Sequence, residues 1–494
     1  MSAKTPNERI IFGLKVKQLR QGQGKSFADL AAATGMSVSY LNEIEKGKKF
    51  PKADKVANLA RALGTSEEEL KSRGMGRHLE PVESLLRSNF LNELPLELFG
   101  IELGKVAEII ANAPVRVGAF ISTLLELSRS YSLREENFYF GALRAYLELH
   151  DNYFQDLEDA ANSFVARHSI SANRPLPPRQ LSQLLEEVFG YTIVENGLDH
   201  YPALGNLRSV FLPTSKKLLL NSNLNARQRA FQFGKELAFN ALRLQERAQT
   251  SSLLRIRSFE EVLNHSKATY FSVALHLPLE AFIAELERFF QQEKWNAQAI
   301  VDILQQYNIT PEMFYHRLTN VMPKFFGIPQ LFFLRFTHNQ STGEFSIDRE
   351  LHLNRRHHPH ANAIQEHYCR RWISLSLLED LQKRLATGEN LQQIVDVQRS
   401  RYLGTEDEYL CITLARPGYP SPHHNVSVTL GLLINDDVKR TIKWLDDPNI
   451  QYREVHTTCE RCMLQDCQER AAEPTIVRKR EEFRRIQSAL QSLE

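Results

Sequence analysis

The apolar positions at the start of the chain recur at roughly helical spacing. Ile10, Leu14, Val16 and Leu19 predict a first amphipathic helix. Residues 52–63 repeat the pattern and predict another helix, which a glycine ends. The N-terminal segment is therefore expected to fold as a small helical module.

Two shorter helices are predicted between these from their capping residues. Ser26 can cap the first, with Asp29 three residues later as a variant of the capping box. Gly35 supplies a tight turn, Ser37 can cap the next helix and Gly47 follows its end. Two short helices joined by a glycine turn form the helix-turn-helix geometry.

This segment resembles the XRE/phage-repressor family, down to the SYLNEIEKG ending of its recognition helix. The resemblance implies that residues 1–75 bind double-stranded DNA, with the first turn of the third helix in the major groove. One such module recognises a half-site, so a homodimer on a pseudo-palindromic operator is expected.

The candidate DNA contacts divide by what each side chain can reach. The residues expected to face base edges are Val38, Ser39, Asn42 and Glu43. The remaining candidates, at caps and near phosphates, are Ser26, Ser37, Tyr40, Lys46, Lys48 and Lys49. For Tyr40, packing inside the module is the open alternative.

The segment 76–165 is helical in pattern, and we interpret it as a linker or dimerisation segment. The turn-rich residues 172–178 mark the next boundary. A helix, three strand-like segments and a long helix follow within residues 166–300. This order resembles the ImmA/IrrE-type zinc peptidase domain, whose long helix carries His-Glu-x-x-His.

The residues at that motif argue against zinc peptidase chemistry. Lys235, Glu236, Leu237, Ala238 and Phe239 stand at its five positions, so both histidines are replaced. A protonated lysine is a poor zinc ligand, and phenylalanine cannot bind a metal at all. We therefore predict that the chain is not an enzyme and interpret this region as a pseudopeptidase domain.

The helices of the same region are rich in phenylalanine. Phe231, Phe239, Phe271 and Leu275 are either ordinary core residues or the lining of an apolar pocket for a ligand. The sequence leaves both interpretations open.

Composition indicates a soluble protein of several domains. The chain has 494 residues, 42% hydrophobic and 24% charged, which is enough for three or four domains. It has no apolar stretch of about 18 residues and no apolar signal segment, so we expect a cytoplasmic protein with no membrane partner. The net charge is +2, but residues 1–75 carry +6, which favours nucleic-acid contact at that end only.

Three of the five cysteines lie within nine residues, which favours metal binding over a disulfide framework. Cys459, Cys462 and Cys467 lie on one short segment, and a fourth ligand must come from elsewhere. Four thiolates would suit either a [4Fe–4S] cluster or tetrahedral zinc. Cys411 lies in a strand-like run and is interpreted as a small buried hydrophobe.

Nearly the whole chain resembles the short-chain fatty acyl-CoA regulator family. The matching pieces are RQRAFQFGKELAF, YFSVALHLPLEAF, ITPEMFYHRL, FGIPQLFFLR, the Cys-x-x-Trp of Cys369 to Trp372, and Cys-x2-Cys-x4-Cys-x2-Arg-Ala ending at Ala471. The resemblance implies a transcription factor controlled by a short-chain acyl-CoA. Some members of the family carry an iron–sulfur cluster, which favours a [4Fe–4S] cluster over zinc, and the family pattern makes Cys369 the fourth ligand. The family's Cys-Pro-Leu-Trp is Cys369-Arg370-Arg371-Trp372 in this chain, which leaves the acyl chain length open.

Several alternatives stay open for residues 301–494, the cysteine-bearing domain. A histidine could replace Cys369 as the fourth ligand; the candidates are His357, His358, His360, His423, His424 and His456. Arg335, in a strand-like run, is a candidate for binding a phosphate or carboxylate. The rival functions are a redox or iron sensor with no organic effector and a regulator whose cysteines only hold structural zinc.

The predicted fold class is multidomain, mainly α with α+β parts. In chain order it consists of a helix-turn-helix bundle, a helical linker, a degenerate zincin-like α+β domain and a C-terminal α+β cysteine domain.

Overall fold

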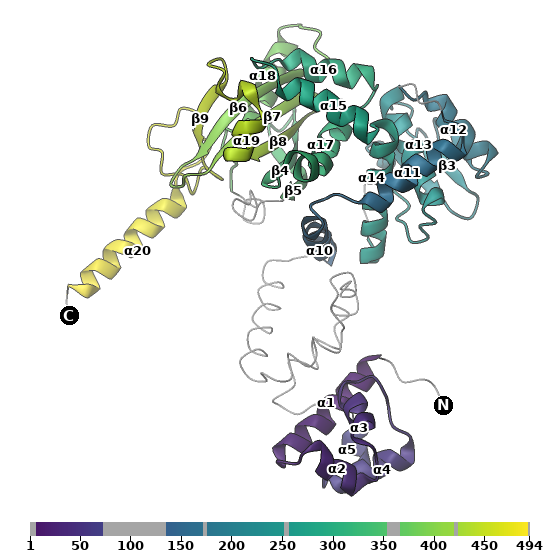
Figure 1. Ribbon diagram of the computed structural model, residues 1–494. Coiled ribbons are helices and arrows are strands. Elements are labelled where there is room, and N and C mark those ends of the chain that lie inside the picture. The colour runs from purple at the N-terminus through teal and green to yellow at the C-terminus, as the bar shows by residue number, and fades with distance from the viewer. Residues whose placement is uncertain are drawn as a thin grey trace. The chain divides into compact units, whose positions relative to one another are not determined.

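The computed structural model describes six stretches of the chain, which are residues 6–72, 135–170, 175–250, 256–352, 366–418 and 423–492. The chain divides into two compact units, Met1–Ala142 and Leu143–Glu494, which we describe separately (Figure 1). Most of the predicted linker, residues 76–134, lies outside the described residues. No helix in the described stretches is long and apolar enough to cross a membrane.

The N-terminal unit contains a bundle of five short helices. These are α1 (Pro6–Gly22), α2 (Phe27–Thr34), α3 (Val38–Glu45), α4 (Ala53–Ala62) and α5 (Glu67–Lys71). The four helices that the sequence predicts are confirmed, although α1 begins earlier than Ile10. Leu30, Leu41, Ile44 and Leu59 are fully buried in the centre of the bundle, so the apolar periodicity marks its core.

Helices α1 and α3 approach closely because α1 has a glycine where they cross. A Cβ atom at Gly13 would overlap with the carbonyl oxygens of Ile44 and Glu45. A buried ion pair joins the same two helices, since the guanidinium of Arg20 donates to both carboxylate oxygens of Glu45, at 2.6 and 2.9 Å. Together these contacts fix the position of α3 in the bundle.

The first part of the second unit surrounds a small mixed sheet. Its helices are α10 (Glu135–Leu149, which begins in the first unit), α11 (Gln155–Arg167), α12 (Pro178–Glu187), α13 (Ala226–Ala241) and α14 (Phe259–His276). The sheet has the order β1-β3-β2 and consists of β1 (Thr192–Val194), β2 (Ser209–Leu212) and β3 (Lys217–Leu220). Strand β3 pairs parallel with β1 and antiparallel with β2. The predicted order of one helix, three strands and a long helix is confirmed.

The rest of the second unit is built on a six-stranded sheet. Its spatial order is β5-β4-β8-β7-β6-β9, with β4 (Leu331–Asn339), β5 (Phe345–His352), β6 (Ile394–Tyr402), β7 (Glu408–Pro417), β8 (His424–Leu433) and β9 (Gln451–Val455). The helices are α15 (Leu279–Phe290), α16 (Ala297–Gln306), α17 (Pro311–Phe326), α18 (Ile373–Ala386), α19 (Asp436–Thr441) and α20 (Thr475–Gln491). Neighbouring strands are antiparallel except β6 and β9, which are parallel.

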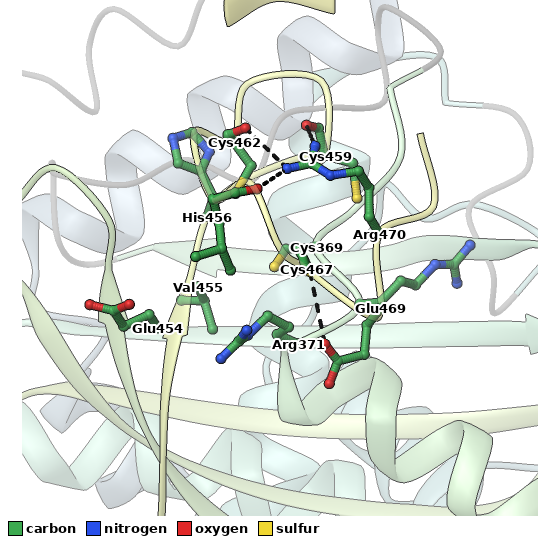
Figure 2. A pocket seen from close by; sticks show the side chains of 12 residues that line it. Cys369, Arg371, Glu454, Val455, His456, Cys459, Cys462, Cys467, Glu469 and Arg470 are labelled. Atoms are coloured by element: carbon green, nitrogen blue, oxygen red, sulfur yellow. Dashed lines mark hydrogen bonds between the residues drawn. The ribbon is translucent and has the colours of Figure 1, made fainter. Parts of the chain in front are cut away.

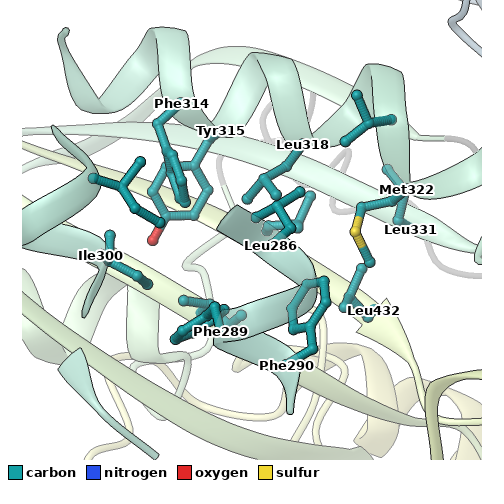
Figure 3. Close-up of a cluster of buried hydrophobic side chains, with 14 of the residues drawn as sticks. Leu286, Phe289, Phe290, Ile300, Phe314, Tyr315, Leu318, Met322, Leu331 and Leu432 are labelled. Carbon is teal, nitrogen blue, oxygen red and sulfur yellow. The ribbon is translucent and has the colours of Figure 1, made fainter. Parts of the chain in front are cut away.

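Both faces of this sheet are covered by apolar side chains. Phe333 of β4 belongs to the core formed with α15, α16 and α17, whereas Phe332 belongs to the core under α18. Figure 3 shows part of the first core, where Phe314 of α17 and Leu432 of β8 are among the buried side chains. Because both faces are covered, almost every residue of β7 and β8 is buried, including polar ones such as Ser427 and Thr429 of β8.

A buried ion pair joins the two parts of the second unit. Arg317 of α17 donates to both carboxylate oxygens of Glu158 of α11, at 2.5 and 3.0 Å. Tyr270 of α14 donates to the same carboxylate at 2.7 Å. The side chains of Arg317 and Glu158 are only 0% and 3% exposed, so each charge depends on the other.

Candidate functional site

The caps predicted for the helix-turn-helix are present and hold α2 and α3 in place. Ser26 Oγ accepts a hydrogen bond from the Asp29 amide at 3.2 Å, and Asp29 Oδ2 accepts one from the Ser26 amide at 2.8 Å. Gly35 ends α2 with a φ of 68°, in the left-handed region that favours glycine. Ser37 Oγ accepts a hydrogen bond from the Tyr40 amide at 3.2 Å and caps α3. Ser26 and Ser37 therefore act first as caps.

The first turn of α3 leaves its candidate base-contacting residues accessible. Val38 is 47% exposed, Ser39 is exposed and Asn42 is half-buried. On the opposite side of the same helix, Leu41 and Ile44 are fully buried. An exposed valine at a helix N-terminus leaves an apolar surface that a thymine methyl group could contact.

The other candidates form a polar group at the end of α3. Glu43 pairs with Lys49 at 2.8 Å, so this carboxylate already has a cationic partner. Tyr40 is half-buried, and its ring lies 4.3 Å from Lys55 Nζ and 5.7 Å from Lys49 Nζ. Lys46 and Lys48 are exposed beside this group. Lys55 lies on α4, and nothing in its local sequence singled it out.

In the second unit, the glutamate of the altered His-Glu-x-x-His motif forms an ion pair. Arg247 donates to both carboxylate oxygens of Glu236, at 2.7 and 2.8 Å, and Tyr191 donates to one of them at 3.1 Å. The guanidinium of Arg247 also lies 4.0 Å from the ring centres of Phe211 and Phe239. Because Arg247 and Tyr191 donate to its two oxygens, this carboxylate is not placed to act as a base on a metal-bound water.

Lys235, the residue before it, is buried, and no carboxylate of the described residues forms an ion pair with it. Its Nζ atom lies 3.4 Å from Nδ1 of His265, and the whole residue is 5% exposed. Burial lowers the pKa of Lys235 to about 7, and the positive charge of Arg349 acts in the same direction. Burial and the charge of Lys235 also keep the pKa of His265 well below its usual value.

Lys235 belongs to a group of five basic residues. We call them the cationic cluster; they are Arg208, Lys235, Arg335, Arg349 and Arg416. Arg349 and Arg208 act on the pKa of Lys235, whereas Arg335, Arg349 and Arg416 act on that of Arg208. Three carboxylates accompany them, and one of these is Glu236, whose charge raises the pKa of Lys235. Arg416 donates to Glu312 at 2.6 Å, and Arg335 pairs with both Glu312, at 3.6 Å, and Asp348.

Among the described residues, the cationic cluster has five basic side chains against three carboxylates. Desolvation lowers the pKa of Arg208 to about 10, the carboxylate of Glu312 opposes this change, and Arg335, Arg349 and Arg416 add to it. Burial alone would raise the pKa of Glu312, but Arg416, Arg335 and Arg208 outweigh it and keep this pKa well below its ordinary value. As a candidate for binding an anion the sequence singled out only Arg335, because the other members come from distant segments that the fold brings together.

The aromatic residues proposed for an apolar pocket lie mostly in packed core. Phe239, Phe271 and Leu275 are buried in the cluster that fills the space around the small sheet. Phe231 is half-buried and packs against the neighbouring core, with its ring 6.0 Å from Lys235 Nζ. Phe231 therefore lies beside Lys235 of the cationic cluster.

The structure brings the four predicted cysteine ligands together by pairing two segments of backbone. The Cys369 amide donates to the Thr457 carbonyl at 3.3 Å, and the Cys459 amide donates to the His367 carbonyl at 2.9 Å. A β-bridge between Tyr368 and Thr458 continues the pairing. Cys369 is therefore held beside the segment that carries the other three cysteines, and the four line one pocket (Figure 2).

Charged side chains fasten the same two segments. Arg461 donates to both carboxylate oxygens of Glu366, at 2.6 and 2.7 Å, and His367 Nδ1 lies 2.8 Å from Glu460 Oε1. Arg461 thus joins the segment that carries Cys459 to the segment that carries Cys369, and it is absent from the lining of the pocket. Arg470 instead folds over it, donating to the carbonyl oxygens of Cys459 and Cys462 at 3.0 and 3.4 Å (Figure 2).

Zinc and a [4Fe–4S] cluster would each need the four cysteines in a different arrangement. In the described part of the chain, no group of three or more His, Cys, Asp or Glu side chains is placed to hold one metal ion. Zinc needs its four ligands around one point at about 2.3 Å, whereas each iron of a [4Fe–4S] cluster takes its own cysteine. The amide of Ala471 donates to Cys459 Sγ at 3.4 Å, the type of contact that tunes cluster thiolates.

The remaining candidate ligands are placed as follows. Cys411 is buried in the core under α18, where burial raises its pKa to about 12. Of the six histidines considered as ligands, His456 lines the cysteine pocket, whereas His423 and His424 are absent from its lining. The other three lie outside the described residues; these are His357, His358 and His360. Burial raises the pKa of Cys369 to about 11.

Comparison with known proteins matches two segments to families. Residues 11–72 match the family described as a helix-turn-helix domain, and residues 187–319 match the IrrE N-terminal-like domain. The first covers nearly all of the bundle α1–α5, and the second covers the small sheet, the helices α13 to α16 and the start of α17.

Full-length relatives have the same extent as this chain. The HTH-type transcriptional regulator RamB of Mycobacterium tuberculosis is 23% identical, with 93% of this chain and 94% of RamB covered. The propionyl-CoA carboxylase regulator of Cereibacter sphaeroides is 21% identical, with 96% of each chain covered. A solved structure of a Mycobacterium tuberculosis transcriptional regulator is 20% identical and gives a TM-score of 0.45, with 67% of this chain and 92% of that one covered. The chain thus joins a helix-turn-helix domain to an IrrE-like domain and is homologous, over nearly its whole length, to transcriptional regulators.

Proposed function

We propose that the chain is a sequence-specific DNA-binding transcriptional regulator of the cytoplasm. The observation that carries the proposal is the first turn of α3, where Val38 and Ser39 are exposed while Leu41 and Ile44 fix the helix in the bundle. The +6 charge of residues 1–75 supplies the attraction to phosphate. Because one module recognises a half-site, the active form is a homodimer.

Selection from a random duplex DNA pool tests this proposal. The full-length protein should enrich one half-site sequence, and Asn42→Ala should relax the preference at one position by about 1–3 kcal/mol. Lys48→Ala should weaken all sequences alike and lower the salt slope by about one. A pool with no enriched sequence would overturn the proposal.

We further propose an acyl-CoA as the effector. CoA carries several phosphate charges, and the cationic cluster offers more positive than negative charge to an anion. The name of the Cereibacter sphaeroides relative, a propionyl-CoA carboxylase regulator, points to the same class of metabolite. An acyl-CoA that prefers one conformation would shift the population able to bind DNA.

Calorimetry with propionyl-CoA, free CoA and propionate tests this effector. Binding of both CoA compounds, together with loss of at least about tenfold in affinity in Arg349→Ala, would place the phosphates at the cationic cluster. Arg288→Ala, an exposed arginine on α15 paired with Glu285, is the matched control. Absence of binding by any acyl-CoA would favour a redox or iron sensor without an organic effector.

For the cysteine pocket we propose a [4Fe–4S] cluster held by Cys369, Cys459, Cys462 and Cys467. When bound, the cluster would supply sensitivity to oxidation and to iron. Around it, Arg470 holds the loop carbonyls and Ala471 donates its amide to a ligand sulfur. The convergence of the four cysteines on one pocket supports this proposal.

Metal and sulfide analysis of protein purified without oxygen tests the cluster. About four irons and four sulfides per chain, lost in Cys462→Ala, would agree with it. About one zinc and no sulfide would instead make the cysteines a structural zinc site. Cys411→Ala, which alters a buried cysteine of the α18 core, should keep its iron and is the matched control.

A further inference from the structure

The C-terminal helix α20 leaves its apolar side chains exposed in the described part of the chain. None of its residues is buried, and Phe483, Ile486 and Leu490 are 60%, 52% and 59% exposed. In Figure 1 it extends away from the sheet of its own unit. A helix of this length gains little stability by itself in water, because most helical stability in proteins comes from packing an apolar face.

The apolar residues of α20 form a narrow stripe of the coiled-coil type. Ile476, Phe483 and Leu490 follow one another at intervals of seven residues, and Ile486 lies between the last two. Lys479 occupies the equivalent position between the first two. This spacing of three and four residues gives a seam that suits one partner helix.

The charge beside this seam is of one sign. A groove along α20 is lined by Ile476, Lys479, Arg480, Phe483, Arg484 and Gln487, with three basic residues and no acidic one. The whole helix carries five basic and two acidic side chains. Arg485 and Glu481 are absent from this lining and project from the other side of the helix.

We propose that α20 docks an amphipathic helix of a partner protein whose flanking residues are acidic. The seam selects a helix, and the basic groove selects the sign of its charge. A second copy of α20 would bring the same net positive charge, which opposes self-pairing. A lipid surface favours a broader apolar face than a seam interrupted by Lys479, and DNA phosphates would leave Phe483 and Leu490 without a function.

The start of α20 is attached to the cysteine segment. The amides of Ile476 and Val477 donate to the Glu460 carbonyl at 3.1 and 3.4 Å, and Glu460 lies between two cysteines of the pocket. The direction in which α20 presents its seam is therefore set by the same segment that holds Cys459 and Cys462. The docking surface itself depends on neither a metal nor an effector.

Two synthetic peptides of about three heptads, with the same Leu and Ile seam, test the proposal. One carries Glu and the other Lys at the flanking positions, and each is titrated with the full-length protein by fluorescence anisotropy. We expect the Glu peptide to bind at least about tenfold more tightly than the Lys peptide. The double change Arg480→Glu with Arg484→Glu should reverse this order.

Matched variants separate the groove from charge in general. Arg484→Glu should weaken the Glu peptide several-fold, whereas Arg485→Glu, with the same change of charge on the far side of α20, should leave it unchanged. Phe483→Ala should weaken it with no change of charge. Equal binding of the two peptides would overturn the proposal. A dimer that light scattering detects in the parent and not in Phe483→Ala would also overturn it. The same holds if neither peptide binds and the protein instead binds phosphatidylglycerol vesicles in a way that Phe483→Ala abolishes.

Discussion

Buried charges in this protein are stabilised by partners that meet them only in the folded chain. Glu236 lies on α13, and Arg247 reaches it from beyond the end of that helix while stacking between two aromatic rings. A carboxylate taken out of water costs several kcal/mol unless such a partner is present. The pair lies at the glutamate of the altered His-Glu-x-x-His motif.

Arg247→Ala should destabilise the second unit strongly, because it leaves Glu236 buried and unpaired. We expect a loss of about 3–5 kcal/mol in the free energy of unfolding, measured by urea denaturation. Arg288→Ala breaks an exposed pair with Glu285 and should cost about 0–1 kcal/mol. Similar midpoints for the two variants would show that burial does not matter at Glu236.

Lys235 should make the stability depend on pH. Its pKa is about 7 in the folded chain, lowered mainly by burial, and about 10.4 when unfolded. Between these values the unfolded chain binds the proton and the folded chain does not. The free energy of unfolding should therefore rise with pH in this window, by at most about 1.4 kcal/mol per unit from this residue.

The comparison with Lys235→Met isolates this contribution. The variant should be more stable at pH 7 and should lack the extra rise between about pH 7 and 10. Parallel pH profiles for the two proteins would contradict the shift. Added acyl-CoA should make the free energy of unfolding of the parent protein rise less steeply with pH, because an anion beside Lys235 favours its charged form.

At the scale of helices and strands, the sequence predicts features that depend on neighbouring residues better than features that depend on distant segments. Ser26, Ser37 and Gly35 act through neighbours three or four residues away, so the helix-turn-helix was predictable from its caps. The order of the six-stranded sheet was not, since β6 pairs in parallel with β9 across some fifty intervening residues. The cationic cluster was not predicted for the same reason, because Arg208 and Arg416 come from segments that are far apart in the sequence.

Gly13→Ala should separate α1 from α3. The added methyl group would overlap with backbone carbonyl oxygens of Ile44 and Glu45, and backbone cannot move aside as a flexible side chain can. We expect a loss of about 1–3 kcal/mol from overpacking, with weaker operator binding. Gly22→Ala, at the end of α1 where nothing lies within 4 Å, should change neither and is the matched control.

At the scale of the whole molecule, the two units differ in how their cores are connected. Shared contacts hold the second unit together. Helix α14 contributes to two of its cores, and Arg317 joins α17 to Glu158 of α11. The first unit has a small core of its own around Leu41 and Ile44. We therefore expect two unfolding transitions for the full chain, one for each unit.

Scanning calorimetry of three proteins checks this expectation. Gly13→Ala should lower the temperature of one transition only, and Arg317→Ala should lower that of the other. The second shift should be large, because removing one partner of a buried pair costs about 3–5 kcal/mol. A single transition that both variants shift together would mean that the two units unfold cooperatively. An effector bound to the second unit could then act on the helix-turn-helix through stability alone, whereas separate transitions require the connecting segment to transmit the change.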